Sequence, residues 1–288
     1  MAWVTCSEDY MSRGSSAKPV SVAVIRPGLL PFMPVERQVE LFPLTTLIEM
    51  PDTTGTADAW GRVEASDSHL YLVKTDERGG KAIRASEWVG TRLAEELNMP
   101  CPTPKIIQLS DGRLCFGSRI ISGIADVAKT SQILTSVTVG TGVTPILGLQ
   151  ALLSALYAFD MFTNNVDRHD ENYLSIEDRG TRRFYAIDFG RSLFWHGKLD
   201  NFPTATQLTR ITFKKIVQRH GYDPAAANAM LDRLAEIGSD KISAAFSSMP
   251  DSWLEQAARV EFTSWWENGE RQRRIDALRK GLSDASLI

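Results

Sequence analysis

The sequence has few cysteines, no long apolar run and little net charge, and each absence excludes a class of protein. Its three cysteines are far apart and lack metal-ligand spacing, so we expect reduced thiols in a cytoplasmic protein. Residues 20–33 are mildly apolar but contain Arg26 and Pro27 and are too short to span a bilayer, and the start does not resemble a signal sequence. A net charge of -3 gives no general attraction to nucleic acid or to an anionic membrane, so we expect neither partner.

The most informative residues are two aspartates and an asparagine in the second half of the chain. Asp167 and Asn172 lie five positions apart, and Asp188 follows within an Asp-Phe-Gly triplet. Kinases use this set of groups to orient the attacking hydroxyl and to hold magnesium on ATP. The spacing therefore predicts phosphoryl transfer.

The sequence around these residues predicts the elements that carry them. Residues 144–162 are apolar nearly all round, which predicts a buried helix, with Asp160 as a buried polar brace. Residues 173–176 and 184–187 read as two short strands joined by a polar turn. A helix, a loop, a hairpin and Asp-Phe-Gly thus follow in the order found in kinases.

Each residue type suits a role in this chemistry. Asp167 would orient or accept the proton of the attacking hydroxyl, while Asn172 and Asp188 supply the oxygen ligands that magnesium prefers. His169 either touches the phosphates or braces the loop. The alternative is purely structural: these polar side chains form a hydrogen-bonded turn and Asp188 caps a loop.

A cation for the phosphates is expected from the first half of the chain. Residues 69–74 form an apolar strand pattern ending in Lys74, and residues 82–98 form a helical pattern with Glu87 on its apolar face. A carboxylate on that face needs a partner, and Lys74 is the nearest candidate. Otherwise Lys74 is an ordinary surface lysine.

Two further segments are candidates for the nucleotide site. Residues 53–62 contain Gly55 and other small residues whose backbone amides could approach phosphates, although they match no standard glycine motif. Residues 118–123, which include Ser122, would connect the lobes and offer backbone groups to adenine. Either segment could instead be an ordinary surface loop or linker.

The remaining pattern is mostly helical. Strands are expected at residues 105–109 and 113–117, around an Asp-Gly turn. Helices are expected at 207–219, 224–237, 241–246, 252–266 and 271–282.

In these motifs the chain resembles the HipA-like kinases, bacterial proteins with a compact two-lobed fold. Asp-Arg-His-x-x-Asn at residues 167–172 is also similar to phosphatidylinositol kinases, but the resemblance to HipA-like proteins extends from about residue 41 to 282. It implies an α+β protein-kinase-like fold with a β-rich N-lobe and a mostly helical C-lobe. It also implies serine/threonine kinase activity with ATP and Mg²⁺ as cofactors.

The resemblance assigns residues and partners. Asp167 matches the catalytic aspartate, Asn172 and Asp188 match the metal ligands, and Lys74 matches the nucleotide-binding lysine. The acceptor would be a protein or the kinase itself, with a role as toxin or regulator and an antitoxin or regulatory partner. The chain lacks the extra N-terminal subdomain of full-length HipA proteins, and its phosphate loop does not align clearly.

The expected organisation is a disordered tail at 1–18, an N-lobe at 19–121 and a C-lobe at 122–288. Two other functions stay open. One changes the acceptor to a lipid headgroup or a small molecule. The other is a pseudokinase that binds a nucleotide or a partner without catalysis.

Overall fold

The computed structural model describes residues 42–51, 58–80, 82–135, 146, 148–178, 181–197 and 199–288. All of them belong to one compact unit, residues 40–288. The expected tail at 1–18 and the candidate Gly55 lie outside the described residues.

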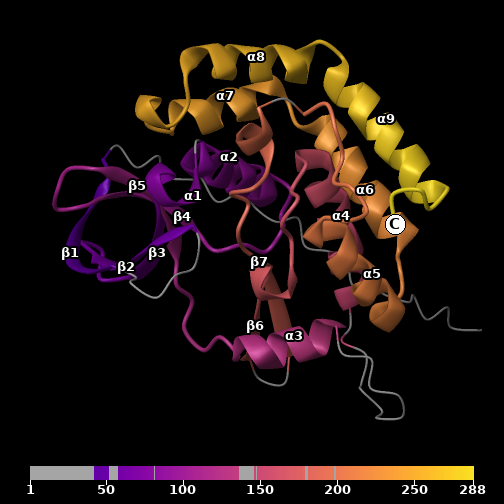
Figure 1. Cartoon of the computed structure of the whole chain (residues 1–288), viewed down its shortest axis with the longest axis horizontal. Helices are drawn as coiled ribbons and strands as arrows, with labels where there is room; N and C mark the ends of the chain where they lie inside the picture. The colour runs from indigo at the N-terminus through magenta and orange to yellow at the C-terminus, as the bar shows by residue number, and fades with distance from the viewer. Residues whose placement is uncertain are drawn as a thin grey trace, which may run out of the picture. The chain divides into compact units, whose positions relative to one another are not determined.

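A closed β-barrel forms the N-terminal region, drawn in indigo to purple in Figure 1. The strand order around it is β1-β2-β3-β5-β4, with antiparallel neighbours except for the parallel pair of β1 and β4. The strands are β1 (Leu44–Pro51), β2 (Ala59–Ala65), β3 (Leu70–Lys74), β4 (Pro104–Gln108) and β5 (Leu114–Arg119). Side chains such as Val63, Tyr71 and Ile107 fill the interior.

The barrel corrects one expectation. Residues 59–62, which we assigned to a phosphate-covering loop, belong to β2. The inward positions at the start of this strand are Ala59 and Gly61, which are buried although their side chains are small. These small residues weaken the apolar alternation of β2, which was therefore not expected. Its partner β1 was not expected because apolar side chains such as Leu47 and Ile48 occupy exposed positions.

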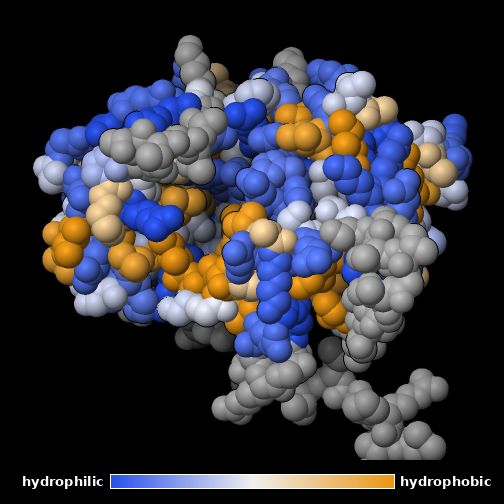
Figure 2. All heavy atoms as spheres, turned by 60° about the horizontal axis from the view of Figure 1, so that its bottom comes forward, coloured by the Kyte–Doolittle hydropathy of each residue, from blue (hydrophilic) through white to orange (hydrophobic). Residues whose placement is uncertain are grey.

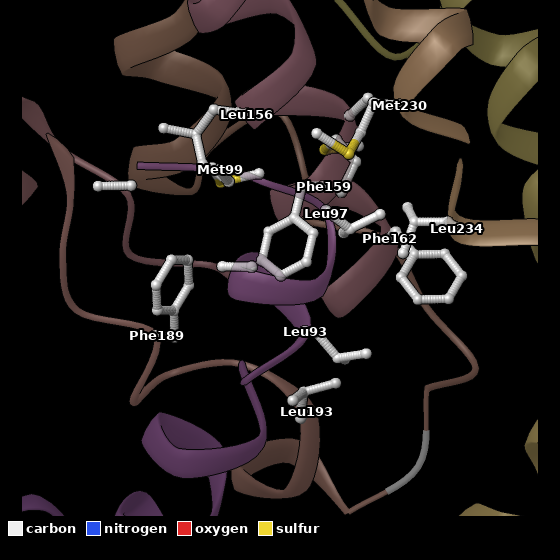
Figure 3. Packing of buried hydrophobic residues seen from close by; sticks show 14 of the residues in the cluster. Leu93, Leu97, Met99, Leu156, Phe159, Phe162, Phe189, Leu193, Met230 and Leu234 are labelled. Atoms are coloured by element: carbon white, nitrogen blue, oxygen red, sulfur yellow. The ribbon is translucent and has the colours of Figure 1, made fainter. Parts of the chain in front are cut away.

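Helix α2 (Ile83–Glu96) packs between the barrel and the helical region. It follows the single turn α1 (Asp76–Gly79) and ends before Pro100, close to the predicted bounds. Figure 3 shows Leu93 and Leu97 from this segment packed with Phe159 of α4 (Leu149–Thr163) and with Phe189. One continuous apolar core therefore joins α2 to the elements that carry the motifs.

The C-terminal region is helical around α4. Its other helices are α3 (Val127–Thr135), α5 (Leu208–His220), α6 (Pro224–Glu236), α7 (Ser239–Ser247), α8 (Gln256–Glu267) and α9 (Glu270–Ser283). The predicted helices are present with shifted ends, except that the expected helix at 252–266 is divided into a short 3-10 turn at Asp251–Trp253 and α8, and that α3 was not expected. The hairpin of β6 (Tyr173–Asp178) and β7 (Thr181–Ala186) is present, but its strands are longer than predicted, because residues that we assigned to the turn, such as Glu177 and Arg182, pair with each other.

Helix α4 ends where the motif begins. Asn164 adopts a left-handed conformation, φ 55°, and its backbone N–H bonds back into the last turn. The buried Arg274 of α9 donates to the carbonyl oxygens of Met161 and Phe162 in that turn, and to those of Leu199 and Asn201. A guanidinium suits this place because the end of a helix carries partial negative charge.

The barrel also carries exposed apolar residues. Leu47, Ile48 and Met50 of β1 and Leu70 of β3 are all exposed. Figure 2 shows apolar residues on the barrel, at the left of that view. Among the described helices, none is both long and apolar enough to cross a membrane.

Candidate active site

Lys74 and Glu87 form a buried ion pair between the barrel and α2. Lys74 is the last residue of β3 and Glu87 lies one turn into α2, and both side chains are almost fully buried. The Lys74 Nζ to Glu87 Oε1 distance is 2.5 Å. The contact that the sequence suggested is therefore present, and Lys74 is not a surface lysine.

Asp188 completes a three-residue cluster with this pair. Its Oδ2 lies 2.8 Å from Lys74 Nζ, and the next backbone N–H, that of Phe189, donates to Glu87 Oε2 at 3.0 Å. Asp188 itself adopts a left-handed conformation, φ 63°, which turns its side chain toward Lys74. Three segments far apart in the sequence thus meet at one ammonium group.

The three members of this cluster differ in how strongly their surroundings favour the ionised form. Burial alone would raise the pKa of Asp188, but Lys74 outweighs burial and lowers it to about 2. Burial would lower the pKa of Lys74, yet the two carboxylates hold it above its usual value. Burial raises the pKa of Glu87, against the effect of Lys74. Asp188 is therefore the more firmly ionised carboxylate, and its side chain is 30% exposed.

Two glycines allow the Asp-Phe-Gly segment to approach α2 this closely. A Cβ added to Gly90 of α2 would lie 2.7 Å from Phe189 Cβ, and one added to Gly190 would lie 2.7 Å from Ile83 Cγ1. Non-bonded carbon atoms in proteins essentially never come this close to each other. Both positions therefore require glycine for the contact between α2 and residues 188–190.

The catalytic-loop candidates Asp167 and Asn172 are joined directly. Asn172 Nδ2 donates to the backbone oxygen of Asp167 at 2.9 Å, and Asn165 Oδ1 accepts from the Asp167 N–H at 3.2 Å. The amide nitrogen of Asn172 is thereby occupied, so its carboxamide oxygen is the end left for another partner. The Asp167 side chain is 27% exposed.

A buried brace holds this loop against the residue before Asp188. Arg168 Nε and Nη2 bond to the two carboxylate oxygens of Asp160 at 2.8 and 3.0 Å. Its Nη1 donates to the backbone oxygens of Asn172 and Ile187. The expected role of Asp160 as a buried brace is confirmed, and the brace ties Asn172 and the residue before Asp188 to one guanidinium.

Sequence reasoning missed Arg191, which bonds to two carboxylates. Its Nε lies 3.1 Å from Asp58 Oδ2, just before β2, and 3.4 Å from Asp167 Oδ2. Burial raises the pKa of Asp167, and Arg191 opposes that rise. The only sequence signal was the basic residue after Asp-Phe-Gly, which has no strong structural meaning by itself.

Thr209, the second residue of α5, was also missed. Its hydroxyl donates to the Asn165 oxygen at 2.6 Å and accepts from the Arg168 N–H at 2.9 Å. The first turn of α5 is therefore fastened to both sides of Asp167.

A pocket lies beside the Lys74 cluster. It is lined by Leu72 and Lys74 of β3, by Thr91 of α2, by Phe116 and Ser118 of β5, by Cys101 and Pro102, and by residues 186–189. The pocket is small, about 40 Å³, and combines an apolar wall from β3 and β5 with the ionised groups of Lys74 and Asp188.

Two other predicted residues are placed differently. His169 is half-buried beside Asp167, and its backbone oxygen accepts from the Asn172 N–H at 3.0 Å. Ser122 is exposed in the connection from β5 to α3 and does not line the pocket, where Ser118 does.

The barrel, the helical region and the converging ionised groups define the protein-kinase-like fold class. A model of the HipA-like kinase family matches residues 62–270. The chain belongs to the HipA-like kinase family, which makes it a kinase.

Two solved structures resemble it at low sequence identity. The proinflammatory kinase CtkA of Helicobacter pylori has a TM-score of 0.57 and 12% identity, over 83% of this chain and 98% of CtkA, and this likeness shows the fold. HipA of Shewanella oneidensis, in its complex with HipB and operator DNA, has a TM-score of 0.45 and 13% identity, over 86% of this chain and 70% of HipA. No curated protein matches the chain significantly.

Proposed function

We propose that this kinase transfers the terminal phosphate of ATP, with Mg²⁺, to a serine or threonine hydroxyl of a protein. The observation that carries the proposal is the bridging of Glu87 and Asp188 by Lys74, beside a pocket with an apolar wall from β3 and β5. Phosphoryl transfer needs positioned charge more than covalent chemistry, and this cleft holds such charge.

The proposed roles follow from the contacts. Lys74, kept cationic by two carboxylates, neutralises phosphate charge, and Glu87 holds it in place. Asp167 is partly exposed and its pKa is raised, mainly by burial, so it is suited to orient and accept a hydroxyl proton. We assign His169 to supporting this loop through its backbone.

The donor set fits a magnesium ion. Asn172 presents a carboxamide oxygen because its nitrogen is already bonded, and Asp188 presents a partly exposed, ionised carboxylate. Magnesium usually keeps several waters and is held by one or two protein oxygens together with the phosphates of its substrate. When bound, magnesium would neutralise charge on the phosphates.

The wider setting is part of the same proposal. We place the kinase in the cytoplasm, with autophosphorylation or a protein target, and with an antitoxin or regulatory partner as the family resemblance implies. Gly55 stays a candidate for the phosphate-covering loop.

Incubation with γ-labelled ATP and magnesium, with and without a bacterial protein extract, tests the proposal. We expect labelled protein with the wild type, and loss of label in both Asp167→Ala and Asp188→Ala. Glu171→Ala is the matched control, because Glu171 is an exposed carboxylate of the same loop. If the label appeared only in lipid or in a small molecule, the assignment of a protein acceptor would be wrong. If the protein bound ATP but transferred no phosphate, it would be a pseudokinase and not an active kinase.

A further inference from the structure

Helix α5 presents an exposed stripe with an apolar part and a basic part. Leu208 and Ile211 are 43% and 37% exposed, and Lys214, Lys215 and Gln218 are exposed along the same face. The spacing of three and four residues keeps these side chains in one row. The opposite face, which includes Phe213 and Ile216, is buried against the core.

The stripe begins next to the catalytic-loop candidate Asp167. Leu208 precedes Thr209, whose backbone N–H and hydroxyl bond to the carbonyl oxygens of Val166 and Asn165. Figure 1 shows α5 beside α4, the helix that leads into this loop. A protein whose hydroxyl reaches Asp167 therefore has to pass close to the first turn of α5.

The charge of α5 is one-sided. Residues 208–220 contain four lysines and arginines and no acidic residue, in a chain whose net charge is -3. Arg210 and Arg219 donate to backbone carbonyls. Within the described part of the chain, Lys214 and Lys215 have no acidic partner, so their charge faces solvent.

We propose that the α5 stripe, defined as Leu208, Ile211, Lys214, Lys215 and Gln218, docks an acidic amphipathic segment of the acceptor protein. Apolar side chains of that segment would cover Leu208 and Ile211, and its carboxylates would face the two lysines. The proposal rests on the proposed protein-kinase function, and it names the substrate class as an acidic protein.

Two features favour a protein over other anionic partners. The end of the stripe nearest the loop is aliphatic, whereas phosphate backbones are bound by cations and nucleobases by stacking aromatic groups. A membrane surface is usually recognised by clusters of more basic residues than the two free lysines here. Opposite charge at the edge of an apolar contact typically selects and steers a protein partner.

The test measures peptide binding directly, so that it does not depend on catalysis. One fluorescent helical probe carries leucines on one face with glutamates beside them and a single serine, and its matched probe has lysine at every glutamate position. By fluorescence anisotropy, we expect wild-type protein to bind the glutamate probe about tenfold more tightly, with the preference falling as salt is raised.

Variants locate the binding. Lys215→Glu and Ile211→Ser should each weaken binding of the glutamate probe about fivefold, by removing a charge contact and an apolar contact respectively. Lys280→Glu, an exposed lysine on α9, should leave binding unchanged. All three substitutions are at exposed positions, and the melting temperature of each variant is compared with that of the wild type to show that the fold is retained.

Several outcomes overturn the proposal. Equal affinity for the two probes does so, as does equal loss of binding in Lys280→Glu. So does Lys215-dependent binding of single-stranded DNA or of phosphatidylserine vesicles without binding of the peptide. If the glutamate probe binds through α5 but labelled ATP reaches no acceptor, the docking surface stands and the proposed kinase function fails. If the probe is phosphorylated, Lys215→Glu should raise KM and leave kcat unchanged.

Discussion

Two buried charge clusters meet at the short segment after β7. One includes the side chain of Asp188, and the other bonds to the backbone oxygen of Ile187. The cleft cluster consists of Lys74, Glu87 and Asp188, and the brace cluster consists of Asp160 and Arg168 with their bonded backbone oxygens. In the cleft cluster one carboxylate is 30% exposed, whereas in the brace cluster the side chains of Arg168 and Asp160 are 2% and 0% exposed.

The difference between the two clusters shows which buried charges can contact a ligand. In the brace cluster, Arg168 Nε and Nη2 donate to the Asp160 carboxylate, so the two charges neutralise each other and serve only to hold the loop in place. In the cleft, Lys74 holds an aspartate that still faces the pocket. Changes in the cleft cluster should therefore affect activity, and changes in the brace should affect stability first.

The largest effect is expected from Asp188→Asn, which should lower kcat by about a thousandfold or more, because it removes the ionised group that we propose acts on the transferred phosphate. Glu87 still partners Lys74 in this variant, so the melting temperature should change little. Turnover of labelled ATP and thermal unfolding measure the two effects. A large loss of stability with the activity retained per folded molecule would reverse the assignment of the two clusters.

The next largest effect is expected from Arg168→Met. It leaves Asp160 buried without its cation, which should cost about 3–5 kcal/mol of unfolding free energy. Urea denaturation measures the loss. The double variant Asp160→Leu/Arg168→Met removes both charges and should recover part of the stability, since no uncompensated charge is left. A single variant as stable as the wild type would show that the brace is not a stabilising unit.

A smaller effect tests the contact between α2 and Phe189. Gly90→Ala places a methyl group 2.7 Å from Phe189 Cβ, so we expect a loss of about 1–3 kcal/mol from overpacking. Displacement of Phe189 would also shift Asp188, so nucleotide affinity, measured by calorimetry, should fall as well. Unchanged affinity with reduced stability would separate the packing from the cleft.

The smallest effect concerns pH and Arg191. Burial raises the pKa of Asp167 and Arg191 opposes that rise, so Arg191→Gln should raise the pKa further. Because Asp167 must be ionised to accept a proton, the acidic limb of the kcat/KM profile should move to higher pH. Asp58→Asn removes a carboxylate that also raises this pKa, so it should move the same limb to lower pH. Shifts in one direction for both variants would contradict this electrostatic account.

The sequence predicted the cleft better than the barrel around it. Lys74 and Glu87 were predictable because a buried helical face with a carboxylate needs a cation, and a strand ending in lysine supplied one. Strand β2 was not predicted because Ala59 and Gly61 bury little apolar surface. Strand β1 was not predicted because its apolar side chains, such as Leu47 and Ile48, are exposed and break the alternation. Arg191 and Thr209 were missed because their partners, Asp58 and Asn165, are set by tertiary contacts that no spacing encodes.

Arg274 has a consequence for synthesis. It lies on α9, the last helix, and its guanidinium closes the end of α4 from which the Asp167 loop departs. A nascent chain that has not yet released residues 270–283 from the ribosome lacks this closure. The loop that carries Asp167 therefore gains its full support only after α9 has left the ribosome, so activity is delayed until that helix has been made.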